Sequence, residues 1–447
     1  MIKYTRLFIT FLLAIIITKT QAQSTATTSS PYSKFGIGDI DNQLMPQNIG
    51  MGGIATATNN IGGYNSINVI NPASYGKIFF TTIDAGVSTN VLTLSKNGFA
   101  DSRNANTRLS HIVMAFPVTK NSALSFGILP YSEIGYNYKT SQKGFGTSPT
   151  PSGSANVDTN VTNYIYSGEG GLTKAYLGYG FGIGRHLTVG ANVSFIFGNL
   201  KQFQSTELPG LAGAIDSRIE EDNKVNGVNF DYGAQYTVDL SATKHLVLGY
   251  SASVGNRLNE QSGYIVSQYY YDQSGNQQVA ADSIINTQNP NAKLQLPRIN
   301  HFGISFQKDN SFLVGADFSM GNWSDLSIAG VNAGLQNNKI FNIGGQITPN
   351  ANALSNYFAL WDYRLGFIYE QTYLNVNNVN LNRYAVTFGL GIPLPHDRAS
   401  SAFYKINFSA EIGRRGTLTS DLIQEKYVNF HLAFLLNDRW FQRFKFE

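Results

Sequence analysis

Residues 428–436, within a strand-like segment at 425–437, alternate between apolar and polar side chains almost without exception. Val428, Phe430, Leu432, Phe434 and Leu436 take every second position, with Asn429, His431 and Ala433 between them. A period of two with one apolar face indicates a β-strand whose faces meet different environments. The pattern recurs at 78–95, 108–118, 122–139, 162–183, 187–204, 225–240, 244–260, 293–307, 311–323, 338–347, 361–374, 382–393 and 403–414.

The connections between these segments alternate in length. Tight polar turns at 119–121, 184–186, 242–244 and 308–310 alternate with long polar stretches at 140–161, 205–224 and 261–292. Outer-membrane barrels are laid out in this way, with short periplasmic turns and long external loops. An ordinary soluble all-β protein would not order its loops so regularly. We therefore predict an all-β fold, a transmembrane antiparallel β-barrel of about fourteen strands.

Alternation also predicts which side chains face lipid. In one strand Leu187, Val189, Ala191, Val193, Phe195 and Phe197 are predicted to face outward, and Thr188, Asn192 and Ser194 inward. An Arg or Lys on the lipid face near the bilayer midplane would cost roughly 2–4 kcal/mol, so charges are expected inside. The charges predicted to form a network that braces the lumen are Asp231, Asp317, Arg364, Glu370 and Glu411.

The N-terminus has the features of a secretory signal. Lys3 and Arg6 precede a short apolar run at 7–18, and small residues around a cleavage position follow it. The apolar run is too short to span a bilayer comfortably as a helix. We predict a signal peptide at 1–22, a flexible tail at 23–30 and export to the outer membrane of a Gram-negative cell.

Composition and spacing exclude several classes of function. The chain has no Cys, which excludes disulfides, thiolate metal sites and a Cys nucleophile. Its six His residues show no metal-site spacing, and no Ser-nucleophile or phosphate-loop motif stands in a suitable context. Lys and Arg are scattered and the net charge is only +4, so nucleic-acid binding is not supported. We expect no enzyme activity, no metal and no cofactor.

Residues 31–77 are Gly- and Asn-rich and lack sustained alternation, so composition leaves them open as a plug or as a loop. The small-residue stretch 48–57, followed by Asn71, Pro72 and Ala73, resembles the N-terminal hatch of FadL-type long-chain fatty-acid transporters. The resemblance covers the whole mature chain. It implies a fourteen-stranded barrel at 78–447 that is preceded by a hatch at 31–77.

The C-terminal half resembles the version of such barrels found in bacteria with type 9 secretion; the matching segments are 363–367, 387–393 and 437–441. Members of the FadL-type family let hydrophobic molecules diffuse across the outer membrane, past the hatch and out through the barrel wall. The resemblance therefore implies passive uptake of small hydrophobic compounds, with membrane lipid around the barrel.

A second function stays open beside uptake. Related barrels serve as non-transporting subunits of barrel-assembly or type 9 secretion machines, and their partners are other outer-membrane proteins. The external stretch 146–153 is polar rather than apolar, which fits a transporter poorly. A ligand path would need inward apolar side chains near the hatch. The candidates are Ile61, Ile67, Val69 and Ile70 on the hatch, Leu313 and Ile368 on the wall, and Leu208 and Leu211 outside.

Overall fold

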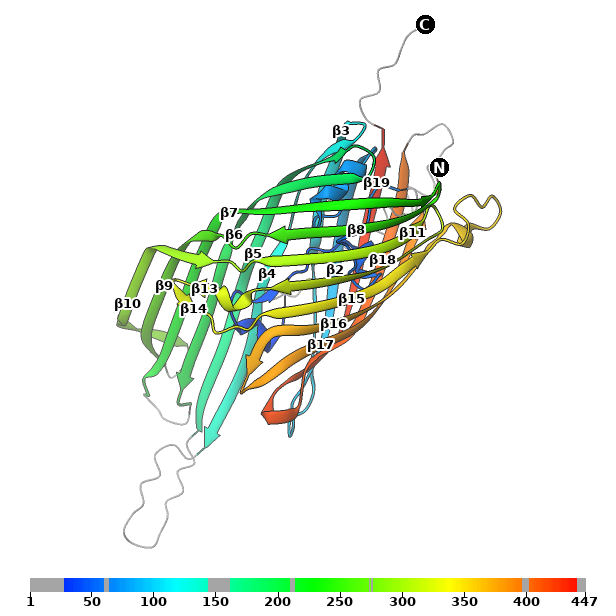
Figure 1. The fold of residues 1–447 in the computed structure, drawn as a ribbon. Coiled ribbons are helices and arrows are strands. Elements are labelled where there is room, and N and C mark those ends of the chain that lie inside the picture. Colours follow the sequence, from blue (N-terminus) through cyan, green and yellow to red (C-terminus); the bar gives the residue numbers. More distant parts are fainter. Residues whose placement is uncertain are drawn as a thin grey trace, which may run out of the picture.

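The computed structural model describes residues 28–59, 64–143, 161–209, 214–272, 274, 276–395 and 402–439, which form a closed antiparallel β-barrel (Figure 1). The wall strands are β2 (Thr81–Ser95), β3 (Ser102–Thr119), β4 (Ser122–Lys143), β5 (Val161–Ile183), β6 (Leu187–Glu207), β7 (Asp216–Ser241), β8 (Lys244–Ser253), β9 (Arg257–Tyr271), β10 (Gln277–Gln295), β11 (Ile299–Lys308), β12 (Phe312–Gly321), β15 (Asn338–Ile347), β16 (Asp362–Val376), β17 (Val379–Pro393), β18 (Phe403–Gly416) and β19 (Gln424–Asp438).

Two wall positions are shared by consecutive strands. β8 and β9 follow one another along β7, and β11 pairs with β8 while β10 pairs with β9. Counting each of these successions as one strand gives fourteen, and β19 pairs with β2 along its whole length to close the barrel. The predicted fold class is therefore confirmed, including the number of strands.

The smaller elements lie in the lumen or at its ends. They are η1 (Pro31–Lys34), β1 (Asp39–Ile40), α2 (Pro46–Ile49), η3 (Pro72–Lys77), η4 (Trp323–Asp325), β13 (Ser327–Ile328), β14 (Val331–Asn332), η5 (Tyr357–Leu360) and η6 (Thr419–Asp421). None of the helices among the described residues is long and apolar enough to cross a bilayer.

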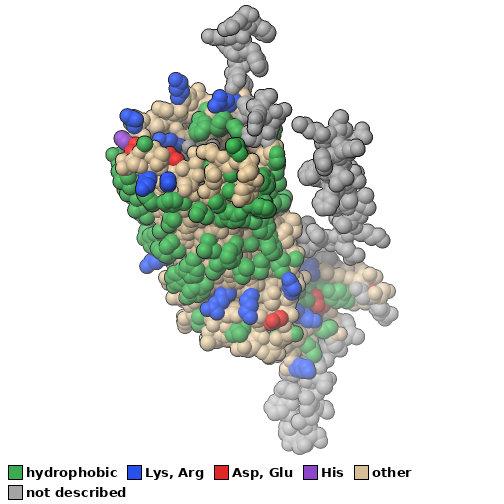
Figure 2. All heavy atoms as spheres, turned by 90° about the vertical axis from the view of Figure 1, so that its right-hand side faces the viewer, with side chains coloured by type: hydrophobic (Ala, Val, Ile, Leu, Met, Phe, Trp, Pro, Cys, Tyr) green, Lys and Arg blue, Asp and Glu red, His purple; other side chains and the backbone are tan. Residues whose placement is uncertain are grey.

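The predicted facing of the strands is confirmed by burial. In β6, Val193 and Phe195 are 49% and 47% exposed, whereas the side chains of Asn192 and Ser194 between them are buried. Figure 2 shows the result on one face of the molecule, where hydrophobic side chains form a broad band and Lys and Arg gather along its margins. Such a band is the lipid-facing surface of an outer-membrane-type barrel.

The two ends of the barrel differ. One end has the tight turns, such as 184–186 and 309–311, and is called the turn end here. At the other, the long-strand end, β4 to β7 reach 21–26 residues while β12 and β15 have 10 each. A transmembrane strand needs only about 9–11 residues. The long strands therefore continue well beyond the wall as a projecting sheet (Figure 1).

Two predicted loops contain much more strand than we expected. The stretch 261–292 is largely the β9–β10 hairpin, and most of 205–224 belongs to the ends of β6 and β7. Both faces of this projecting sheet lie beyond the wall, so its side chains need no apolar face, and the period-two signal disappears. The interior of the 140–161 loop, with the polar stretch 146–153, lies outside the described residues.

Candidate functional site in the barrel lumen

The described residues of 31–59 and 64–77, which we call the hatch, lie in the lumen, and at several points their backbone lies directly against the wall. A Cβ atom on the wall residue Gly366 would overlap the backbone nitrogen of Gly52, and one on Gly344 would overlap the carbonyl oxygen of Met51. Only glycine leaves room for two backbones to approach this closely. The small-residue stretch of the hatch therefore lies directly against a matching set of wall glycines.

Wall side chains satisfy the hatch backbone at this contact. The carboxylate of Asp317 accepts the N–H groups of Ala55 and Thr56, each at 2.7 Å. The Thr387 hydroxyl accepts the N–H of Gly52 at 2.8 Å. Irregular backbone inside a barrel must find such partners, because buried N–H and C=O groups are costly when unpaired. Asp317 thus holds the hatch in place.

Asn71, Pro72 and Ala73 start the short helix η3 near the turn end of β5 and β6. The Asn71 side chain caps this helix by accepting the Ala73 N–H at 3.1 Å, and it donates to the Thr56 carbonyl at 2.7 Å. Pro72 stands at the first helical positions, where its missing N–H costs nothing. All three residues are buried, and Asn71 ties the end of the hatch to its middle at Thr56.

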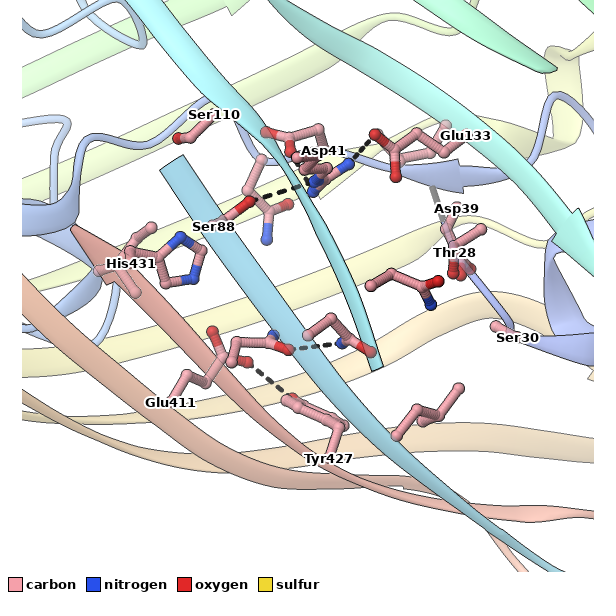
Figure 3. Close-up of a pocket in the computed structure, with 18 of the residues that line it drawn as sticks. Thr28, Ser30, Asp39, Asp41, Ser88, Ser110, Glu133, Glu411, Tyr427 and His431 are labelled. Carbon is pink, nitrogen blue, oxygen red and sulfur yellow. Dashed lines mark hydrogen bonds and ion pairs between the residues drawn. The ribbon is translucent and has the colours of Figure 1, made fainter. Parts of the chain in front are cut away.

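Three arginines in the lumen each lie between two carboxylates. Figure 3 labels four of these carboxylate residues, Asp39, Asp41, Glu133 and Glu411. The triplets are Asp41–Arg108–Glu133, Glu370–Arg383–Glu411 and Asp39–Arg415–Glu425. The two pairs of Arg383 measure 2.7 and 2.9 Å, and those of Arg415 measure 2.8 and 2.7 Å. Asp39 and Asp41 belong to the hatch, so two triplets join it to the wall. We call the three together the arginine triplets.

The arginine triplets surround a cavity of about 200 Å³. Besides all three arginines, its lining includes Tyr427 and His431, both labelled in Figure 3. A second cavity of about 150 Å³ lies next to it and shares Arg383 and Arg415. The second one is more apolar, because Ile40, Ile70, Ile299, Trp323 and Ile340 contribute to its lining.

The five charges predicted to form one network belong to four separate groups. Asp231 pairs with Lys174 at 2.7 Å, and Asp317 binds the hatch backbone as described. Arg364 and Lys405 both contact Asp362, at 2.8 and 2.7 Å. Glu370 and Glu411 share Arg383. Strand alternation gives the direction of a side chain but not its height in the barrel, so it cannot tell which inward charges meet.

The eight residues proposed for a ligand path are also dispersed. Leu313 packs against Met51 and Ile54, Ile368 packs in a cluster with Leu92 and Tyr427, and Ile67 and Val69 pack near Tyr75. Ile70 lines the second cavity, and Leu208 lies at the end of β6. Ile61 and Leu211 lie outside the described residues. Most of the described ones are buried in side-chain packing, and they do not line one continuous tunnel.

An apolar cluster lies at the level where the projecting sheet leaves the wall. Leu258, Leu294, Trp323, Leu326 and Leu335 are among its buried members. They come from β9, β10 and the segment between β12 and β15, and Tyr32 and Ile37 of the hatch join them. The lumen is therefore covered by packed side chains toward the long-strand end, and the arginine triplets lie on the turn-end side of this cluster.

The sequence predicted Glu370 and Glu411 as inward charges, but the three arginines of the triplets and the wall glycines were missed. Their signal was present in part, since Arg383 has the same strand parity as the inward residues Ala385 and Thr387. Gly344, Gly366 and Gly389 likewise occupy inward positions where a barrel wall would otherwise carry side chains. Inward glycines in strands opposite a Gly-rich hatch would have predicted this backbone contact.

The family model described as BamG matches residues 1–447, the whole chain. No curated protein matches this chain. The fold resembles that of the Pseudomonas putida toluene transporter TodX, with a TM-score of 0.56, 15% identity, and 91% of this chain and 99% of the other covered. For the Ralstonia pickettii toluene transporter TbuX the TM-score is 0.53 and the identity 16%, with 89% of this chain and 98% of the other covered. For a Pseudomonas aeruginosa FadL homologue the TM-score is 0.54 and the identity 11%, with 91% of this chain and 100% of the other covered.

Proposed function

The chain belongs to the BamG family, and from this premise we propose that it is a non-transporting barrel subunit of a multi-protein outer-membrane machine. The family designation favours a machine that assembles barrels over type 9 secretion, the other machine that the sequence left open. The role calls for no enzyme activity and no cofactor. Its partners are other outer-membrane proteins, and its surroundings are lipid.

The observation that carries this proposal is the set of charged groups in the lining of the larger cavity. An apolar solute that entered it would have to displace water from three arginines and from most of their carboxylates. Burying charges without restoring their hydration is costly, so ion pairs line a poor path for a hydrophobic compound. The hatch and the apolar cluster at the long-strand end further close the lumen to a passing solute. A barrel of this kind suits a role carried out by its outer surfaces.

Passive uptake of small hydrophobic compounds remains a second candidate, because the fold is shared with toluene transporters. The second cavity favours it, since Ile70, Ile299 and Trp323 give an apolar surface beside the hatch. Uptake would require the hatch to move, because hatch residues 40–43 and Ile70 form part of the lining of this cavity.

One purification separates the two functions. The tagged full-length protein is extracted in mild detergent, and co-purifying proteins and bound lipids are both identified. A stoichiometric large partner without a bound amphiphile is expected. A lone barrel that carries a fatty-acid-like molecule would overturn the subunit proposal. Ile70→Arg is a matched variant, because it should abolish binding in the second cavity and leave a protein complex intact.

A further inference from the structure

β10 leaves one edge of the projecting sheet open. On one side it pairs with β9 from Gln277 to Gln295. On its other side, the strand pairings of the described residues include only Gln295 with Ser327. The next wall strand, β12, ends at Gly321 opposite Ile299, where β10 has already given way to β11. Figure 1 shows β10 at the outer margin of the projecting sheet, with no strand beyond it.

An open edge has a definite chemistry. In an antiparallel strand every second residue directs its N–H and C=O groups away from its partner strand. The pairing of β10 with β9 is regular over 285–289, so two or three of these five residues present such groups on the open side. Water satisfies these groups in a lone sheet, whereas a second strand would satisfy them in a regular ladder.

The middle of this edge lacks the usual protection against pairing. Natural edge strands carry charges, especially Lys, or proline and bulges. β10 has bulges on both sides of 285–289, and Pro290 lies in the second one. Within 285–289 the register with β9 is unbroken and all five side chains are uncharged. Ile285, at the start of this stretch, is 44% exposed. We call residues 285–289 the open edge.

We propose that the open edge binds an extended segment of a second protein, which adds to the projecting sheet as a further strand next to β10. Repeated N–H and C=O groups at strand spacing are matched by another polypeptide backbone, which is how β-strand addition gives affinity. The uncharged side chains of the open edge suit a neutral, β-forming segment. This inference rests on the proposed function, because it assumes that the chain is a subunit with a protein partner. It places that partner at the long-strand end, outside the cell.

Photo-crosslinking at two neighbouring positions tests the proposal. Thr287 and Gln288 point to opposite faces of the sheet, and each is replaced by a photoreactive amino acid in the full-length protein in its native membrane. A strand added at the edge presents side chains on both faces, so both positions should form an adduct with the same protein. Glu221 on β7 is the control, since it is exposed but paired on both sides, with Gln202 and Tyr264. It should give no such adduct.

The outcomes are distinct. An adduct from only one of Thr287 and Gln288 would mean docking on a face and overturns the edge proposal. An adduct with the mass of two copies of this chain, or with lipid alone, also overturns it. If a partner co-purifies stoichiometrically but neither position captures it, the edge inference fails while the proposed function stands. If the chain purifies alone, the proposed function itself fails.

A pair of proline variants adds a second measurement. Asn286→Pro and Thr287→Pro remove adjacent N–H groups that point to opposite sides of β10. One of the two therefore leaves the β9–β10 ladder intact, as judged by amide hydrogen exchange, and removes a donor from the open side. That variant should lose most of the co-purified partner while the barrel keeps its heat-modifiable gel shift. Full retention of the partner would contradict strand addition.

Discussion

The lumen and the β9–β10 hairpin differ in whether their polar groups have hydrogen-bond partners within the chain. In the lumen, Asp317 and Thr387 accept hydrogen bonds from the hatch, and each arginine of the arginine triplets has two carboxylates. On β10, the open edge has a strand partner on one side only. These groups of the hatch and the wall are therefore paired within one chain, whereas the open edge lacks a strand on one side. This difference is the reason that we propose partner recognition at the projecting sheet and not in the lumen.

Deletion of the hatch should have the largest effect, because it opens the lumen. Deletion of 31–77 takes away the backbone that fills the lumen and two carboxylates of the triplets, Asp39 and Asp41. Because the wall strands pair with one another, the barrel should still fold and show a heat-modifiable gel shift. In planar bilayers we expect conductance to rise from background to discrete pore steps. Unchanged conductance would mean that the lumen is closed by something other than the hatch.

Breaking one arginine triplet should be the next largest effect. Arg383→Met leaves Glu370 and Glu411 as unpaired carboxylates in a buried site, which costs about 3–5 kcal/mol of folding free energy. The midpoint of thermal unfolding in detergent, followed by gel shift, should fall accordingly. Adding Glu370→Gln and Glu411→Gln to the same chain should restore most of the loss. A triple variant as weak as the single one would argue that the arginine acts through packing.

A methyl group at the wall–hatch contact should have a moderate effect. In Gly366→Ala the new Cβ would overlap the Gly52 backbone, so the hatch must shift, at a cost of roughly 1–3 kcal/mol. Protease accessibility of the hatch and bilayer conductance should both increase. Gly182→Ala is the matched control, because its Cβ would approach no atom closer than 3.6 Å. Equal behaviour of the two variants would contradict backbone-to-backbone packing.

The smallest effect is expected at the tip of the β9–β10 hairpin. Asp272 accepts the backbone N–H groups of Asn276 and Ser274, and these bonds lower the pKa of its carboxyl group. Since the folded-state pKa lies below the unfolded one, the carboxylate stabilises the turn at neutral pH, and this contribution is lost as the pH falls through the lowered pKa. After correction for the intrinsic exchange rate, amide protection at the tip should therefore fall in acid, and Asp272→Ala should show low protection at every pH. Protection in the lumen should not change.

The sequence by itself determined the barrel, because each wall strand has one face toward lipid and one toward the lumen. That asymmetry is local and repeats every two residues, so alternation located all fourteen strands and the facing of β6. It failed where both faces of the projecting sheet lie beyond the wall, as in 261–292. In that segment the two faces of the strand do not differ in polarity, so the sequence predicted a loop where the structure has strands.

Only the tertiary structure decided which inward residues meet. Arg383 and Glu411 lie 28 positions apart in the chain, and Arg415 and Asp39 lie 376 apart. Their pairing depends on barrel closure and strand register, which combine many weak long-range contacts, so no short sequence window contains it. The open edge has the same origin, since it exists because β12 ends opposite Ile299 and does not continue beside β10.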